Sequence, residues 1–150
     1  MANENLLYDI AKHEFLTGQT NWEEDAFKVV LVDDSYVLDA QNHESYEDIE
    51  DHIIGGSDLV QDLINTTTQG KDGVAYANNV TFPEVPQVDS RDNTNYSVAG
   101  IIIYKQVSST DPSKNKLVAF IGNIDNLPLA TNGGDIEVIW DAGTNKVFTL

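Results

Sequence analysis

The feature that most constrains the fold of this chain is the run at residues 97–105, SVAGIIIYK, which holds three consecutive isoleucines. Isoleucine is β-branched, so its χ1 angle is restricted and it packs well on the pleated surface of a sheet. Side chains of a strand alternate between the two faces, so adjacent isoleucines need an apolar cover on both sides. The run therefore predicts a central strand that the rest of the chain covers.

Other apolar runs predict the strands around it. Residues 26–33, AFKVVLVD, indicate a second central strand. Residues 117–124 and 135–141 follow the isoleucine run along the chain, with turn residues between them. We expect these two segments to be consecutive antiparallel neighbours in the same sheet.

The remaining strands are expected to be short. Val74, Tyr76, Val80 and Phe82 alternate with other residues on either side of a kink at residues 78–79. Residues 58–69 could be a strand or a short helix, and their threonines favour a strand. At the C-terminus, a turn at residues 143–145 predicts a closing hairpin.

The N-terminus predicts one amphipathic helix over residues 1–18. Asn3 can cap it and Gly18 can end it. Its apolar residues recur at helical spacing, in the rows Leu6/Ile10 and Leu7/Ala11/Phe15. Such a helix could cover an open end or edge of the sheet, or it could dock on a neighbouring subunit.

Acidic residues are concentrated in the first part of the chain. The formal net charge is −17, with 25 Asp and Glu against eight Lys and Arg. Residues 1–60 contribute −13 of this charge and residues 61–150 contribute −4. A surface this acidic repels phosphate backbones and anionic lipid head groups, so we expect neither nucleic acid nor a membrane as a partner. Solubility is one role for the charge, and a basic protein partner is the alternative.

Metal and cofactor chemistry have weak support in the sequence. The chain has no cysteine, which excludes disulfides, thiol nucleophiles and thiolate zinc sites. Asp33 and Asp34 indicate a solvated turn, because no calcium-loop spacing surrounds them. His43 and His52 are nine residues apart, which is not a ligand pair on one helix face. We expect no metal and no cofactor.

Enzyme motifs are missing as well. No phosphate loop, dinucleotide fingerprint, zinc-protease motif or serine-hydrolase elbow occurs. The acidic segment at residues 43–51 is expected to form a short helix with Tyr46 and Ile49 facing inward, and its charges indicate a solvated face. Trp140 alternates as a core residue, which leaves Trp22 as the aromatic ring expected to be exposed. We therefore expect no enzyme activity.

Taken together, the pattern predicts a single mainly β domain over residues 1–150. The helix occupies residues 1–18, and residues 26–150 form a β-sandwich or a jelly-roll-like fold. The N-terminus has no signal-peptide core and no stretch approaches transmembrane length. The sequence thus predicts a protein made in the cytoplasm.

Several segments together resemble a family of small virion proteins of tailed bacteriophages. They occur in the order NLLYDIAKHEFLTG, FKVVLVD, GVAYANNVTFPEV, AGIIIYK, LVAFIG and NGGDIEVIWDAGTNKVF, and they span nearly the whole chain. The resemblance implies a structural protein of the particle, either a capsid decoration (cement) protein or a tail component. It carries no catalytic residues.

The resemblance leads to one expected function and one alternative. The expected function is a homotrimer on the outer capsid surface of the virion, made in the host cytoplasm, that binds the major capsid protein and stabilises the shell. The helix stripe Leu7, Ile10, Ala11 and Phe15 is the candidate subunit contact. The alternative is an adhesin of the tail tip or fibre, which would bind a host glycan through loops 87–96 or 108–115 with Tyr96, Asn93 and Asn95.

Overall fold

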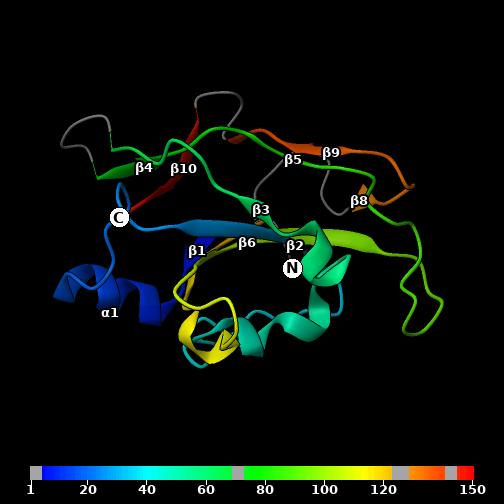
Figure 1. The fold of residues 1–150 in the computed structure, drawn as a ribbon, viewed down its shortest axis with the longest axis horizontal. Helices are drawn as coiled ribbons and strands as arrows, with labels where there is room; N and C mark the ends of the chain where they lie inside the picture. The colour runs from blue at the N-terminus through cyan, green and yellow to red at the C-terminus, as the bar shows by residue number, and fades with distance from the viewer. Residues whose placement is uncertain (1–4, 69–72, 123–128, 141–144) are drawn as a thin grey trace.

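The computed structural model describes residues 5–68, 73–122, 129–140 and 145–150. An antiparallel sheet lies at the centre of the fold (Figure 1). Its strands, in spatial order, are β1 (Asn5–Leu7), β7 (Leu117–Ile121), β6 (Ser97–Lys105), β2 (Phe27–Asp33) and β3 (Gln61–Asp62), with β8 (Leu129–Ala130) beside the start of β6. The fold is mainly β with one α-helix near the N-terminus, which confirms the predicted fold class.

One face of the central sheet is covered by two short ribbons, as Figure 1 shows. One ribbon pairs β4 (Val74–Tyr76) with β10 (Lys146–Thr149), and the other pairs β5 (Val80–Phe82) with β9 (Ile136–Val138). The opposite face is covered by residues 34–60 and by the loop that follows β6. These segments carry the 3-10 helices η1 (Tyr46–Asp48), η2 (Glu50–His52), η3 (Gly56–Leu59) and η4 (Pro112–Lys114).

The central strands have apolar cover on both faces, as their sequences predict. Ile101 and Ile103 belong to the core beneath the ribbons, whereas Ile102 between them belongs to the core on the other face. In the neighbouring strand, Val29 and Val30 are divided in the same way. Burying each such side chain stabilises the fold by about 1.5–3 kcal/mol. The prediction that β6 and β2 are central is therefore confirmed.

The N-terminal helix is shorter than predicted. Helix α1 spans Asp9–Thr17, and Leu6 and Leu7 lie in strand β1, paired with Phe120 and Ala119 of β7. Tyr8 has an extended backbone (φ −68°, ψ 148°) and turns the chain from strand into helix. Strand pairing with the sheet edge satisfies backbone groups that an isolated helical turn would leave to water, and this outweighs the helical spacing of the apolar residues. The proposed cap Asn3 lies outside the described residues.

The end of α1 agrees with the sequence. Gly18 has φ +76°, a left-handed conformation that glycine adopts without a steric penalty. Its N–H bonds to the carbonyl of Phe15, and the next residue bonds to the carbonyl of Glu14. Gly18 ends the helix as predicted.

The C-terminal hairpin prediction is wrong. Strand β9 pairs with β5 and strand β10 pairs with β4, so neither the hairpin nor the pairing of residues 135–141 beside β7 forms. Segments 74–76 and 80–82 offer partners on the apolar face of the central sheet, and the two ribbons together bury that face. Residues 143–144 of the predicted turn lie outside the described part of the chain.

Two smaller expectations also change. The predicted strand over residues 58–69 is present only as β3, preceded by η3, and residue 69 is not among the described residues. Trp22 is buried, not exposed, because its ring packs on Phe27 and Phe148 and its indole N–H donates to the carbonyl of Tyr76 at 3.1 Å. Among the described residues, no helix is both long enough and apolar enough to cross a membrane.

Candidate functional site

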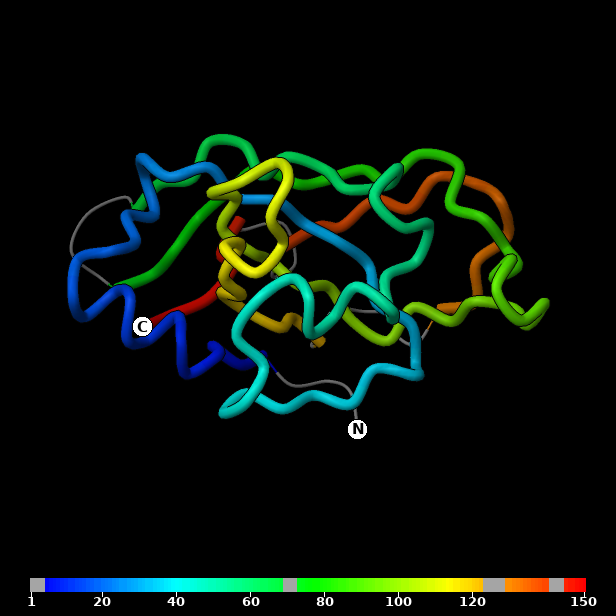
Figure 2. The backbone as a smooth tube through the Cα atoms, turned by 60° about the horizontal axis from the view of Figure 1, so that its bottom comes forward, coloured from blue at the N-terminus to red at the C-terminus, as the bar shows by residue number. Residues whose placement is uncertain are grey.

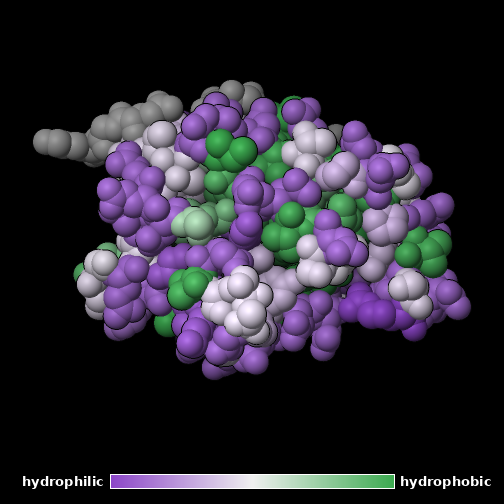
Figure 3. All heavy atoms as spheres, viewed as in Figure 1, coloured by the Kyte–Doolittle hydropathy of each residue, from purple (hydrophilic) through white to green (hydrophobic). Residues whose placement is uncertain are grey.

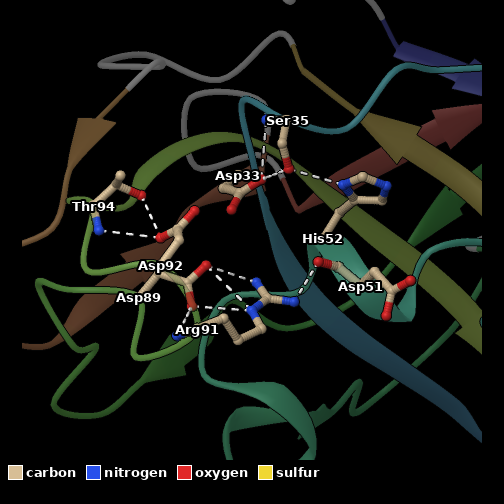
Figure 4. Close-up of polar contacts among 8 residues, drawn as sticks. All are labelled: Asp33, Ser35, Asp51, His52, Asp89, Arg91, Asp92 and Thr94. Atoms are coloured by element: carbon tan, nitrogen blue, oxygen red, sulfur yellow. Dashed lines mark hydrogen bonds and ion pairs between the residues drawn. The ribbon is translucent and has the colours of Figure 1, made fainter.

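A polar cluster lies where strand β2 ends (Figure 4). Asp33 is nearly buried, and its Oδ1 accepts hydrogen bonds from the backbone N–H of Ser35 at 3.0 Å and from the Ser35 hydroxyl. The same hydroxyl lies 2.8 Å from Nδ1 of His52 in helix η2. The turn predicted at Asp33 and Asp34 is therefore held by the Asp33 side chain, as in other turns that begin with aspartate.

A second part of the cluster belongs to the loop after β5. The Arg91 guanidinium donates to both carboxylate oxygens of Asp89, with Nε–Oδ1 and Nη2–Oδ2 distances of 3.0 and 2.9 Å. It also donates to the carbonyl of Asp51, which joins this loop to the segment that covers the sheet. Hydrogen bonds from Arg91 lower the pKa of Asp89, and the same pairing raises the pKa of Arg91. In Figure 4, the hydroxyl and the backbone N–H of Thr94 donate to the carboxylate of Asp92 beside this pair.

The cluster resembles a serine–histidine pair, but its order of contacts is not that of a catalytic triad. In a triad, the carboxylate orients the histidine, which then takes a proton from serine. Here the Asp33 carboxylate bonds to Ser35 itself, and no residue in the described ranges hydrogen-bonds to Nε2 of His52. The arrangement fixes the turn and joins two loops, so it supports a structural role.

Tyr36 lies between two histidines, His43 and His52, that are nine residues apart in the sequence. The rings of His43 and His52 lie 5.5 and 5.6 Å from the Tyr36 ring, measured between centroids. The Tyr36 hydroxyl lies 2.9 Å from Nδ1 of His43 and 2.7 Å from the hydroxyl of the fully buried Tyr8. Spacing along the chain could not indicate this, because the contacts depend on residues 36–52 folding over the sheet. No group of three or more metal-binding side chains gathers anywhere in the described ranges.

The residues of the predicted subunit contact lie against the core of their own chain. Ala11 is buried, and Leu7 and Phe15 pack on the core beneath the ribbons. Ile10 packs on the core of the opposite face. The most exposed apolar side chain of α1 is instead Leu16, at 88%. A subunit contact by the stripe stays a prediction, and Leu16 is the side chain best placed to extend it.

A buried ion pair fastens α1 to the central sheet. Lys105, at the end of β6, places its Nζ 2.8 Å from Oε1 of Glu14 and 2.9 Å from the hydroxyl of Thr20. The carbonyl of Gln19 accepts a third hydrogen bond at 3.1 Å, so all three ammonium protons are used. Glu14 and Lys105 are 91 residues apart in the chain, so no local sequence pattern predicts this pair.

A groove opens where the loop after β6 meets the cover of the sheet. Figures 1 and 2 both place this loop, drawn in yellow, beside the segment that carries η1. The groove has a volume of about 630 Å³, and its lining includes Lys28, Tyr46, Glu50, Tyr104, Ser109 and Asn115. Ligand pockets typically span roughly 300–1,000 Å³, so the groove can hold a small ligand.

The groove wall is held by the amide of Asn115. Its Oδ1 accepts from the backbone N–H groups of Val107 and Ser108, at 2.7 and 2.9 Å, and its Nδ2 donates to the carbonyl of Ser108. These bonds fix the loop at its base and so hold one wall of the groove.

The loops predicted for glycan binding differ in what they offer. Tyr96 in loop 87–96 is buried at 7% exposure, so the prediction of an exposed aromatic ring there is wrong. Asn93 and Asn95 of that loop are exposed. Loop 108–115 lines the groove and lies beside two tyrosines that come from other segments.

Comparisons of this chain with protein-family models, with curated proteins and with solved structures find no match.

Proposed function

We propose that this protein is a structural protein of a tailed-phage virion that decorates the outside of the capsid. The observation that carries the proposal is the ordered set of segments resembling that family. In the fold the first of these segments contains β1 and α1, FKVVLVD is β2, and AGIIIYK and LVAFI lie in β6 and β7. The other two segments contain the strands of the ribbons. The segments that carry the resemblance thus lie throughout the fold and not in one strand.

The distribution of charge supports docking on a basic surface. Residues 34–60 cover one face of the sheet, and their exposed carboxylates include Glu44, Glu47, Glu50 and Asp51. The space-filling view in Figure 3 shows a mostly hydrophilic surface in which apolar residues form separate patches. A carboxylate-rich face favours a partner of opposite charge and accelerates encounter with it. The proposed partner is the major capsid protein.

A homotrimer is the assembly that we propose for this role. Placement on symmetric positions of a shell lets several modest contacts act together, which raises the overall affinity far above that of one contact. The hydrogen bonding of the interior is consistent with a rigid fold. In the described part of the chain, every buried side-chain nitrogen and oxygen has a hydrogen-bond partner. A clamp between capsid subunits needs such rigidity.

Binding to capsids that lack the protein tests the proposal. We expect the purified protein to bind saturably, and more weakly as salt rises. The double variant Glu44→Gln/Glu47→Gln should weaken binding, whereas Glu137→Gln, an exposed carboxylate on strand β9 of a ribbon, should not. A folded protein that does not bind these capsids at low salt would contradict the proposal.

A further inference from the structure

Two tyrosines of the groove present hydroxyls that the protein itself does not use. Tyr104 of β6 is buried along its ring, and Tyr46 of η1 meets it edge-on with centroids 5.0 Å apart. Neither hydroxyl forms a hydrogen bond with any described residue. Every fully buried side-chain oxygen of the described residues has a hydrogen-bond partner. Since the Tyr104 hydroxyl has none, it is not fully buried, and it reaches the solvent of the groove. The Tyr104 ring is therefore held by packing, while its hydroxyl is accessible to a ligand.

These hydroxyls stay protonated near neutral pH. Burial raises the pKa of Tyr104, and the neighbouring Tyr46 adds to the increase. Burial also raises the pKa of Tyr46, with a further contribution from the Glu50 carboxylate. A neutral phenol can both donate and accept a hydrogen bond. The groove therefore holds two fixed groups of this kind, 58 residues apart in the sequence.

Further polar groups around the groove are also free. The Glu50 carboxylate and the hydroxyls of Ser57 and Ser109 line it, and none of them hydrogen-bonds to a described residue. Lys28 is committed to an ion pair with Asp62, and Asn115 is committed to the loop. What remains for a ligand is a set of neutral hydroxyls, the amide oxygen of Gln106 and one carboxylate acceptor. They lie beside the ring of Tyr46 and the apolar side chains of Val60 and Pro112.

We propose that this groove binds neutral pyranose units of a glycan. A sugar ring has hydroxyls that both donate and accept, and an apolar face that packs on an aromatic ring, so it matches both kinds of surface present here. An anionic ligand would meet the free Glu50 carboxylate in a chain of net charge −17. One carboxylate beside a lysine is too few ligands for a divalent cation.

The groove shares part of its surface with the proposed capsid contact, because Glu50 belongs to both. Neither Glu44 nor Glu47, the pair chosen to test capsid binding, lines the groove. Saccharide binding is measured on the free chain without capsids, so its failure and the failure of capsid binding are separate outcomes.

Binding to defined saccharides tests the inference. The full chain is titrated with maltotriose, chitotriose and N-acetyllactosamine as neutral probes and with sialyllactose as the anionic probe, followed by saturation-transfer NMR. We expect at least one neutral probe to bind and sialyllactose to bind more weakly. The double variant Tyr46→Phe/Tyr104→Phe, which keeps both rings, should weaken binding roughly tenfold or more, because two hydrogen bonds to the ligand are lost.

The matched control is Tyr8→Phe, which removes a tyrosine hydroxyl outside the groove and should leave saccharide binding unchanged. Thermal unfolding of each variant shows that the fold is retained, since neither groove hydroxyl bonds to the described protein. Failure of the folded wild-type chain to bind all three neutral probes would overturn the inference. Equal binding by the double variant, or a preference for sialyllactose, would overturn it as well.

Discussion

Gly100 shows how one residue fixes the start of the isoleucine run. A Cβ atom at this position would lie 2.5 Å from Cζ of Phe120 and 3.3 Å from the carbonyl oxygen of Ile121. The Phe120 ring is buried and stacks on Tyr36 with centroids 6.0 Å apart, so it has little room to move. Glycine is therefore needed here for packing and not for a special backbone angle.

The variant Gly100→Ala should lower the free energy of unfolding by about 1–3 kcal/mol, the usual cost of overpacking a core. Urea denaturation followed by circular dichroism measures the change. The second variant Phe120→Leu should partly restore stability in the Gly100→Ala background, because it removes the ring that meets the new methyl group. Equal stability of Gly100→Ala and the wild type would show that Phe120 is not fixed.

Removing one partner of the buried ion pair should be costly. Lys105→Met leaves Glu14 buried without its ammonium partner, and we expect a loss of about 3–5 kcal/mol in the free energy of unfolding. The double variant Glu14→Leu/Lys105→Met removes both charges and should recover much of the loss. A chemical-denaturation series of the three proteins tests this, and a single variant as stable as the wild type would contradict it.

The buried tyrosines predict a loss of stability at alkaline pH. Burial raises the pKa of Tyr36 to about 12 and also raises that of Tyr8. Tyrosines of the unfolded chain titrate near about 10, so the unfolded state loses protons first and stability falls as the pH rises from about 10 to about 12. Urea midpoints across this range should decline, and more gently in Tyr8→Phe. A midpoint that is independent of pH would rule out this linkage.

At the scale of single elements, the sequence predicts a helix or strand correctly where its apolar pattern fits only one secondary structure. The sequences of β2 and β6 are apolar at adjacent positions, so their side chains are all buried only in a strand that is covered on both faces. Residues 5–7 are different, because Leu6, Leu7 and Ile10 fit a helical row as well as a short strand. Long-range pairing with β7 decides between the two, and a local pattern cannot contain that information.

The pairing of strand β1 predicts that substitutions of two adjacent leucines differ in their cost to stability. Leu7 packs against the core, so Leu7→Asp should lower the free energy of unfolding by about 2 kcal/mol or more. Leu6 is exposed at 38%, so the matched variant Leu6→Asp should cost clearly less. Thermal and urea unfolding of both proteins compare the two costs. Equal losses would mean that residues 5–7 do not alternate as a strand does.

At the scale of the whole molecule, the candidate groove shows what the sequence could not predict. Its tyrosines come from η1 and β6, which are brought together only when residues 34–60 fold over the sheet. The loop 108–115 is recognisable in the sequence as a polar tip, yet nothing in the sequence pairs it with Tyr46. The sequence does not predict the two ribbons for the same reason, because β9 and β10 pair with strands that lie more than 50 residues earlier in the chain.

About half of the acidic residues in the first part of the chain lie on one face of the fold. Of the 15 Asp and Glu in residues 1–60, eight belong to residues 34–60, which cover one face of the sheet. Others lie elsewhere: Glu14 is buried and Glu23 bonds to Thr68. The segment 34–60 is therefore the location of the proposed contact with a basic shell.

The measurement that tests the proposed function most directly is the copy number of this protein in purified virions. Quantitative mass spectrometry with isotope-labelled peptides measures it against the major capsid protein of the same particles. A decoration protein on symmetric shell positions should be present in numbers comparable with those of the major capsid protein. A handful of copies would place it at the tail or a vertex, and its absence from the particles would contradict a virion role altogether.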